Sequence, residues 1–200
     1  MLYVLRQRCS RSDSTKKRNH DNNFGTALIK SMETYDTILT RRSIRKYTGE
    51  KIPDEIIEKL LKAAMYAPSA RDCRPWHFIV ITEREILSKI PGVHPYSDML
   101  NEAPLAILVC GDKNLEKSEG YIAIDCAAAT ENILLAAHDI GLGAVWLGVY
   151  PREERMKGLS DLLNLPENII PVSLISIGYP AEEKIPENRF HKDRVHNNKW

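Results

Sequence analysis

The sequence lacks the closely spaced cysteines that a disulfide framework or a zinc site would require. Its 200 residues include four cysteines, no two of which form a Cys-x-x-Cys pair: Cys9, Cys73, Cys110 and Cys126. Cysteines scattered in this way are typical of a protein kept in a reducing compartment. We therefore expect a cytoplasmic protein without a metal site.

The sequence also lacks an uninterrupted apolar run long enough to cross a membrane. A membrane-spanning helix needs about 20 consecutive, predominantly apolar residues. The longest apolar stretch, residues 123–140, is broken by polar or ionisable residues that include Asp125, Glu131, Asn132 and His138. We therefore expect no membrane partner.

A large net charge is absent as well, since the formal net charge is +1. Residues 1–31 contain seven Lys or Arg and two Asp or Glu, hence +5, whereas residues 32–200 contain 21 and 25, hence −4. A nucleic-acid-binding domain normally presents a basic surface. The mildly acidic body therefore argues against nucleic acid as a partner.

Residues 1–31 differ from the rest of the chain in composition. Between Arg11 and Asn23 the sequence is polar and has no apolar period, so this part cannot bury enough surface to order itself. Residues 1–5 are too short for the apolar core of a signal peptide. We expect a disordered basic extension at residues 1–31 and one functional domain at residues 32–200. Alternatively, Met32 is the natural start.

Standard catalytic patterns are missing too. The sequence has no Gly-x-x-x-x-Gly-Lys-[Ser/Thr] loop, no Gly-x-Ser-x-Gly and no His-Glu-x-x-His. Gly141 and Gly143 lead into a predicted strand rather than out of one and lack a third glycine, so they form no dinucleotide fingerprint. The protein therefore either relies on a bound cofactor for its chemistry or only binds a ligand.

Periodicity in residues 32–200 predicts one layered domain of helices and strands. Residues 121–140 predict the longest helix, apolar on nearly all sides and ending at Gly141. Shorter helical patterns begin near Pro53 and Arg152. Apolar runs predict four strands, at residues 77–81, 104–110, 144–149 and 170–178.

One stretch concentrates positive charge within the acidic body. Arg41-Arg42-Ser43-Ile44-Arg45-Lys46-Tyr47 places four cations in its first six positions. The planar fork of arginine suits phosphate oxygens, and a serine hydroxyl fits between two such forks. We interpret Arg41, Arg42 and Ser43 as a phosphate grip, with Arg45 facing another part of the ligand. The simpler alternative is a solvated, charged turn.

A second informative stretch joins a predicted helix to a predicted strand: Ala67-Pro68-Ser69-Ala70-Arg71-Asp72-Cys73-Arg74-Pro75-Trp76-His77-Phe78. Its small residues and prolines make a tight loop in which backbone amides can approach a flat ligand. The alternative is a helix stop and a turn, with Trp76 as a core residue.

Together these stretches resemble the nitroreductase-like FMN oxidoreductases, over about residues 33–200. Each motif alone is weakly specific, but five in register are strongly specific. The motifs are Arg41-Arg42-Ser43-Ile44-Arg45-Lys46-Tyr47, Ala67-Pro68-Ser69-Ala70 with Arg74-Pro75-Trp76-His77-Phe78, residues 132–143, Ala144-Val145-Trp146-Leu147-Gly148, and Arg189-Phe190 with Arg194-Val195-His196.

The resemblance implies an α+β fold with a central mixed β-sheet flanked by helices, in an intertwined homodimer with two FMN sites at the subunit interface. Arg41, Arg42 and Ser43 would hold the phosphate and ribityl end of FMN, and Arg189 would complete the phosphate site. Arg45 would lie at the pyrimidine edge, where a cation stabilises the negative charge that appears on reduction.

The resemblance also places small residues around the flavin ring. Pro68, Ser69 and Ala70 would come from the other subunit, and Leu147-Gly148 would lie beside the reactive ring nitrogen. Asp72 stands where the family usually has asparagine. An ionised aspartate only accepts hydrogen bonds, whereas asparagine also donates them, so this contact with the flavin edge is expected to change.

The implied activity is ping-pong hydride transfer from NADH or NADPH, through FMN, to nitroaromatic, quinone or flavin acceptors. No protein side chain is expected to act as a nucleophile or acid–base catalyst. A short connection at residues 111–120 favours an open pocket that tolerates varied small aromatic acceptors. The alternative function is flavin binding with little turnover, for storage or regulation.

Overall fold

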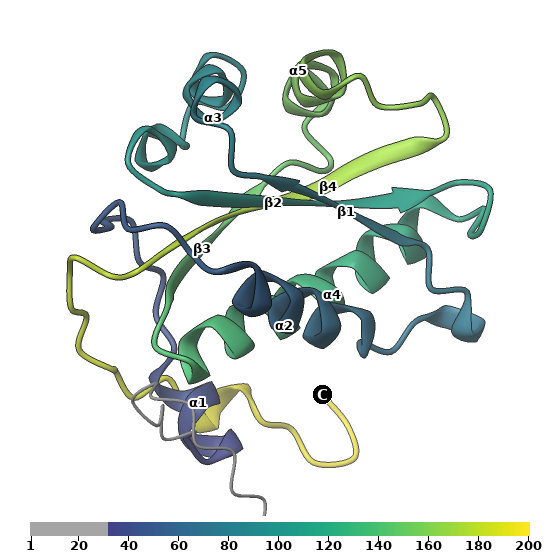
Figure 1. Cartoon of the computed structure of the whole chain (residues 1–200). Helices are drawn as coiled ribbons and strands as arrows, with labels where there is room; N and C mark the ends of the chain where they lie inside the picture. Colours follow the sequence, from purple (N-terminus) through teal and green to yellow (C-terminus); the bar gives the residue numbers. More distant parts are fainter. Residues whose placement is uncertain (1–31) are drawn as a thin grey trace, which may run out of the picture.

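A four-stranded β-sheet lies between two layers of helices in this computed structural model, which describes residues 32–200 (Figure 1). The extension expected at residues 1–31 lies outside the described residues. The strands are β1 (Trp76–Ile81), β2 (Leu105–Asp112), β3 (Gly143–Gly148) and β4 (Ile169–Gly178). The α-helices are α1 (Thr34–Thr40), α2 (Asp54–Met65), α3 (Arg84–Lys89), α4 (Glu119–Asp139) and α5 (Glu153–Leu163).

The sheet has the order β1-β2-β4-β3, and all of its neighbouring strands pair antiparallel. This corrects the expected mixed sheet. Among the described residues, parallel pairing is confined to an isolated bridge between Ser43 and Ala144. β2 is buried along nearly its whole length, as its uninterrupted apolar sequence predicts.

Helices cover both faces of the sheet (Figure 1). α2 and α4 pack on one face, where Leu60 and Ile133 are fully buried. α3 and α5 cover the other face, where Leu87 and Leu159 are fully buried. Each such side chain contributes roughly 1.5–3 kcal/mol of transfer free energy. The sheet is therefore a firm base for the segments along its edges.

α4 is the long central helix that the sequence predicts. Its close approach to β2 requires glycine at position 111, because a Cβ there would lie 2.0 Å from the Ile122 side chain. The helix ends where Gly141 takes a φ of +83°, which glycine adopts without strain. Burial is less complete than expected, since Tyr121 and Ile124 are exposed.

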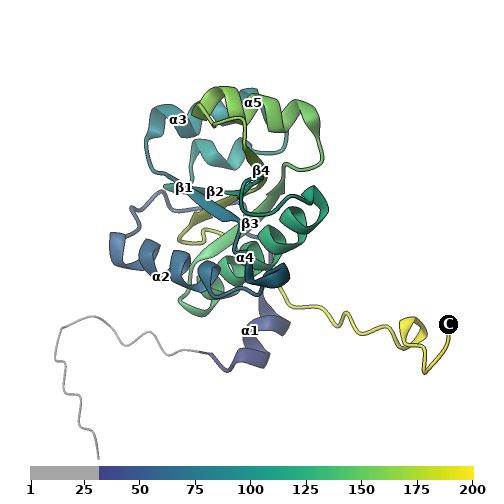
Figure 2. The same cartoon turned by 90° about the vertical axis from the view of Figure 1, so that its right-hand side faces the viewer.

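The C-terminal arm, residues 179–200, runs away from the body of the molecule (Figure 2). Its first part pairs with the segment after α1, where Tyr47 and Pro180 form a bridge and the Ala181 N–H donates to the Lys46 carbonyl at 2.9 Å. Farther along, the arm exposes large apolar side chains, at Ile185, Phe190, Val195 and Trp200. Exposed apolar groups gathered in this way are typical of a surface that another molecule covers.

Candidate cofactor site

The basic segment, residues 41–45, lies where α1 ends and the chain meets the edge strand β3. The Ile44 N–H donates to the Ala144 carbonyl at 3.0 Å. The buried Tyr47 hydroxyl lies 2.7 Å from the Ile44 carbonyl and 3.1 Å from the Ser176 carbonyl. Burial raises the pKa of Tyr47 well above its usual range, so this hydroxyl remains a donor. The cations are thus carried on a backbone tied to the sheet.

Arg41, Arg42 and Arg189 meet at one cavity of about 740 Å³ between α1 and the arm. The Arg42 Nε is buried without a hydrogen-bond partner, and the buried Arg41 Nε has only an ion pair with Glu131. Buried donors without acceptors are costly, and an anionic oxygen satisfies guanidinium donors strongly. This donor set therefore fits a phosphate group.

Arg41 also faces a carboxylate of its own chain. Its Nε lies 3.3 Å from Glu131 Oε1 on α4, and the Glu131 side chain is 43% exposed. An ion pair this exposed contributes at most about 1 kcal/mol. The pair can therefore open when Arg41 meets a stronger anionic partner.

Arg42 has a role that the sequence did not suggest, because it ties the arm to the end of α1. It donates to the carbonyls of Leu39 at 3.0 Å and Arg41 at 2.7 Å, and to the Glu187 carbonyl in the arm at 3.3 Å. These bonds occupy donors that a phosphate would otherwise use. The phosphate grip therefore depends chiefly on Arg41 and Arg189.

The arm also clamps the backbone of Ser43 and Arg45. Lys184 Nζ donates to the Ser43 carbonyl at 2.8 Å, and the Arg45 N–H donates to Glu182 Oε1 at 2.6 Å. The Arg45 N–H, and then the Lys184 ammonium, hold the pKa of Glu182 below its usual range. The clamp fixes the backbone and leaves the Arg45 side chain exposed.

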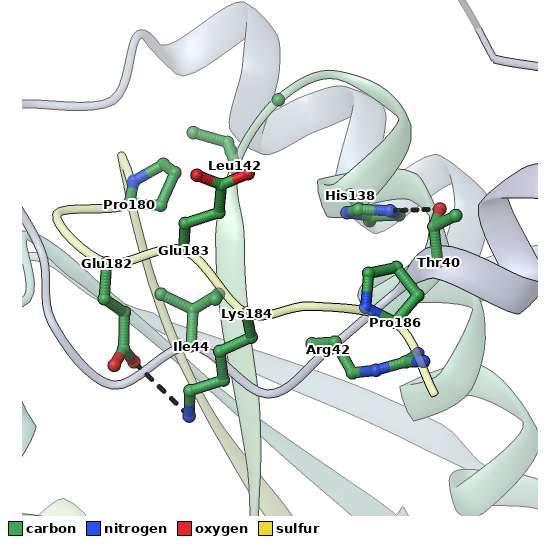
Figure 3. A pocket seen from close by; sticks show the side chains of 11 residues that line it. Thr40, Arg42, Ile44, His138, Leu142, Pro180, Glu182, Glu183, Lys184 and Pro186 are labelled. Atoms are coloured by element: carbon green, nitrogen blue, oxygen red, sulfur yellow. Dashed lines mark hydrogen bonds and ion pairs between the residues drawn. The ribbon is translucent and has the colours of Figure 1, made fainter. Parts of the chain in front are cut away.

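A second cavity, of about 330 Å³, lies between this clamp and the end of α4 (Figure 3). His138 Nε2 lies 2.9 Å from the Thr40 hydroxyl. Burial, and then the charges of Arg41 and Arg42, lower the pKa of His138. The cations at this cavity, Arg42 and Lys184, already have partners within the chain. They connect the arm to the segment after α1 and leave no free charge for a ligand.

Leu147 and Gly148 end the edge strand β3, with Leu147 buried and Gly148 exposed. Two side chains hold the Gly148 carbonyl, His94 through Nε2 at 3.0 Å and Arg155 at 2.7 Å. Because the carbonyl only accepts, His94 carries its proton on Nε2, and its Nδ1 accepts from the Tyr96 N–H at 3.3 Å. Burial lowers the pKa of His94 and favours this neutral form.

Residues 68–70 lie at the other end of α4, where they wall a cavity of about 300 Å³. The Ala70 N–H donates to Asp125 Oδ1 of α4 at 3.0 Å. Asp72 forms two hydrogen bonds with Arg74, at 2.7 and 2.8 Å, on the surface. Asp72 is therefore held by Arg74, two residues farther along the chain.

A single chain does not bring all the predicted site residues together. Ala70 meets α4 at Asp125, whereas Thr40, next to the arginines, meets α4 at His138. These two helix positions lie roughly 20 Å apart at a rise of about 1.5 Å per residue. Residues 68–70 and the basic segment therefore form two groups toward opposite ends of α4.

Residues 32–200 contain neither a cluster of metal ligands nor a membrane-spanning helix. No three His, Cys, Asp or Glu side chains of this region gather as a metal site. No helix of the same region has both the length and the apolar character needed to cross a membrane.

Apart from Arg189 in the arm, the residues of both groups lie on elements within one family match. The family model described as the nitroreductase family matches residues 38–92 and 92–179, which include the basic segment, the loop, α4 and the end of β3. The chain belongs to the nitroreductase family. The resemblance inferred from the motifs is thereby confirmed.

Members of the nitroreductase family from several organisms are similar to this chain. A Methanothermobacter thermautotrophicus protein, provisionally named NADH dehydrogenase/NAD(P)H nitroreductase, is 54% identical over 172 residues, which cover 86% of this chain and 90% of that protein. A Parabacteroides distasonis structure with the same provisional name is 42% identical, with a TM-score of 0.80 over 84% of this chain and 98% of that one. A Desulfovibrio desulfuricans structure, provisionally named a nitroreductase and in complex with FMN, is 30% identical, with a TM-score of 0.73 and coverages of 84% and 97%.

Sequence reasoning missed several side chains that shape this nitroreductase-family site. His94 and Arg155 hold the Gly148 carbonyl, and Asp125 holds the Ala70 amide. For Asp125 a signal was available, because it is an acid within an otherwise apolar helical stretch. For His94 and Arg155 the sequence offers no comparable signal.

Proposed function

We propose that this member of the nitroreductase family is an FMN-dependent oxidoreductase that transfers hydride from NADH or NADPH to a small aromatic acceptor. The observation that carries the proposal is the cavity lined by Arg41, Arg42 and Arg189, where the donors of Arg41 and Arg189 fit one phosphate group. The family and the names of its members confirm the predicted class, an NAD(P)H-dependent oxidoreductase with FMN.

The grip suits FMN better than FAD. Arg41, Ser43 and Arg189 provide donors for a single phosphate, and no glycine-rich loop is present in the sequence to receive a pyrophosphate. When bound, FMN supplies the redox chemistry, accepting hydride from the nicotinamide and giving electrons to the acceptor. The protein side chains bind, orient and tune it.

Arg45 is the residue that we assign to tuning. Its backbone is clamped by Glu182 while its side chain remains exposed. A fixed cation at the pyrimidine edge stabilises negative charge in the reduced state. The backbone at Gly148, held by His94 and Arg155, supplies an open surface beside the reactive nitrogen.

The proposed enzyme is a homodimer whose sites are shared between subunits. Within one chain the loop at residues 68–70 lies at the far end of α4 from the arginines, so a second copy would supply it. The exposed apolar side chains of α1 and of the arm support an interface there. Nitroaromatics, quinones and free flavin are the proposed acceptors, in the cytoplasm, with NAD(P)H and acceptor binding in turn at one open site.

Anaerobic stopped-flow reduction tests the function directly. The FMN-loaded protein should lose its flavin absorbance rapidly on mixing with NADH or NADPH and regain it with an acceptor. Steady-state rates should give parallel lines in double-reciprocal plots. Failure of both nicotinamides to reduce the flavin would contradict the proposal and favour a flavin-binding protein with little turnover.

Arg45→Gln separates tuning from binding. Most FMN should stay bound through Arg41 and Ser43, while the midpoint potential falls and reduction slows by about tenfold or more. Lys46→Gln, at the adjacent exposed cation, is the matched control and should change neither property. An unchanged potential and rate in Arg45→Gln would remove Arg45 from the mechanism.

A further inference from the structure

The loop from Ser69 to Arg74 holds a backbone conformation that its own residues disfavour. Three residues with side chains have positive φ angles, at Arg71 (53°), Asp72 (56°) and Arg74 (47°). Such angles bring the Cβ too close to the backbone in residues other than glycine. A cluster of them persists only where the surroundings impose it.

Bonds within the loop form a surface turn, in which the Asp72 N–H donates to the Ser69 carbonyl at 3.2 Å and the Cys73 N–H to the Ala70 carbonyl at 3.0 Å. The Arg74 N–H donates to Ser69 Oγ at 3.0 Å, and the Arg74 side chain pairs with Asp72. The pair lies on the surface, with 65% and 72% of the two side chains exposed. Exposed pairs of this kind contribute little. Contacts outside the loop are therefore needed to hold this turn in place against the rest of the fold.

The first outside contact is Asp125 of α4. This carboxylate is 3% exposed, and its Oδ1 accepts the Ala70 N–H at 3.0 Å. Its Oδ2 is buried without a hydrogen-bond partner. Burying a carboxylate with one unpaired oxygen costs free energy, which its bond to the loop offsets only in part. The hydrogen bond from the Ala70 N–H to Asp125 fixes the loop where it begins.

The second outside contact is Glu116, in the connection between β2 and α4. Its side chain is 1% exposed, its Oε1 accepts the Ser118 N–H at 2.8 Å, and its Oε2 pairs with Arg71. Arg71 also lies 5.4 Å above the ring of Tyr121 on α4. The Ser118 N–H and the Arg71 guanidinium hold the pKa of Glu116 below its usual range, so it is charged at neutral pH.

We propose that Asp125 and Glu116 are positioning residues that hold this strained loop in the shape presented to the flavin. The proposal rests on the proposed function, in which residues 68–70 contact FMN. Both carboxylates act from the first part of α4 or just before it, so they lock the loop to the central helix of the fold. A loop already in its binding shape loses less conformational freedom when the ligand arrives.

Hydrogen exchange on the apoprotein tests the positioning without the cofactor. In Asp125→Ala, amides of residues 69–74 should exchange at least about tenfold faster than in the unmodified protein, and the Kd for FMN should rise by about tenfold. Asp125→Asn keeps an oxygen for the Ala70 N–H and should restore most of the protection. Glu119→Ala, at an exposed acid on the same helix, is the control.

Two results would overturn the proposal. One is loop exchange in Asp125→Ala equal to that in Glu119→Ala, and the other is exchange in Asp125→Asn as fast as in Asp125→Ala. If Asp125→Ala does not fold, Glu116→Gln tests the second contact, with faster exchange at Arg71 expected and unchanged exchange contradicting the proposal. Failure of the unmodified protein to bind FMN would instead contradict the proposed function, leaving the loop result to stand separately.

Discussion

Arg41 stands between two anions, the Glu131 carboxylate of its own chain and the proposed phosphate. Arg41→Ala should raise the Kd for FMN by roughly 10- to 150-fold, because a hydrogen bond to a charged group contributes about 1.5–3 kcal/mol. Glu131→Gln should lower the Kd a few-fold, since it removes the competing carboxylate. Calorimetric titration of the apoprotein with FMN measures both changes.

Lys59→Ala provides the control for these titrations, because Lys59 is an exposed cation on α2, away from the arginine cavity. It should bind FMN like the unmodified protein. Equal affinities in Arg41→Ala and Lys59→Ala would show that Arg41 does not hold the phosphate.

His94 should make the folded protein sensitive to mild acid. Burial lowers its pKa in the folded state, whereas in the unfolded chain it titrates near 6.5. The unfolded state therefore binds more protons below about pH 6.5, and the stability present above that pH is lost as the pH falls toward the folded pKa. Urea unfolding at pH 7 and pH 5 should show this decline.

His94→Gln should make the unfolding free energy depend less steeply on pH, with a slope smaller by at most about one bound proton. Part of the pH dependence should remain in this variant, because burial also lowers the pKa of His138. His191→Gln, at an exposed position in the arm, should leave the slope as it is. An identical pH dependence in His94→Gln and the unmodified protein would exclude the neutral, buried imidazole.

At the scale of residues, the sequence indicated the cations but not their partners. Arg41 and Arg189 were recognisable by type and motif, because the chemistry of a phosphate site selects arginine. The partners act across long separations, with His94 and Gly148 54 positions apart and Ala70 and Asp125 55 apart. Contacts that the fold creates between distant residues leave no local pattern to read.

At the scale of elements, apolar periodicity located the helices and strands closely. The strand expected at residues 170–178 is found at Ile169–Gly178, and the helix expected at residues 121–140 is found at Glu119–Asp139. The mixed sheet that the resemblance implied was wrong for the described residues. The apolar runs could not correct it, because an apolar run indicates burial and not the direction of the neighbouring strand. β3, for example, pairs antiparallel with β4 at the sheet edge.

α1 and the arm together expose an apolar surface that a second subunit would cover. Tyr35, Ile38 and Leu39 on α1 are 71%, 52% and 51% exposed. The protein should sediment as a dimer at micromolar concentration, and Ile38→Glu with Leu39→Glu should shift it to monomer and release FMN. Ile38→Leu preserves the apolar surface and should leave the dimer intact. A stable, FMN-loaded monomer of the unmodified protein would contradict the shared site.

At the scale of the whole molecule, residues 1–31 should be dispensable. Their composition differs from the body, and the Met32 N–H already meets Asp139 Oδ1 of α4 at 2.9 Å. A chain that starts at Met32 should retain the melting temperature and FMN content of the full chain. Thermal denaturation and flavin absorbance check this. A clear loss of either would assign the extension to the folded unit.

Because the two residue groups lie far apart along α4, two variants that each damage one group should complement each other in a mixed dimer. Arg41→Ala and Asp125→Ala would damage opposite halves of a shared site, so a mixed dimer contains one site with both lesions and one with neither. When the two variants are unfolded and refolded together, at an FMN concentration too low to fill either variant alone, about half of the dimers are mixed and roughly a quarter of all sites bind FMN like the unmodified protein. A mixture that binds no more FMN than its components would place each site within a single chain.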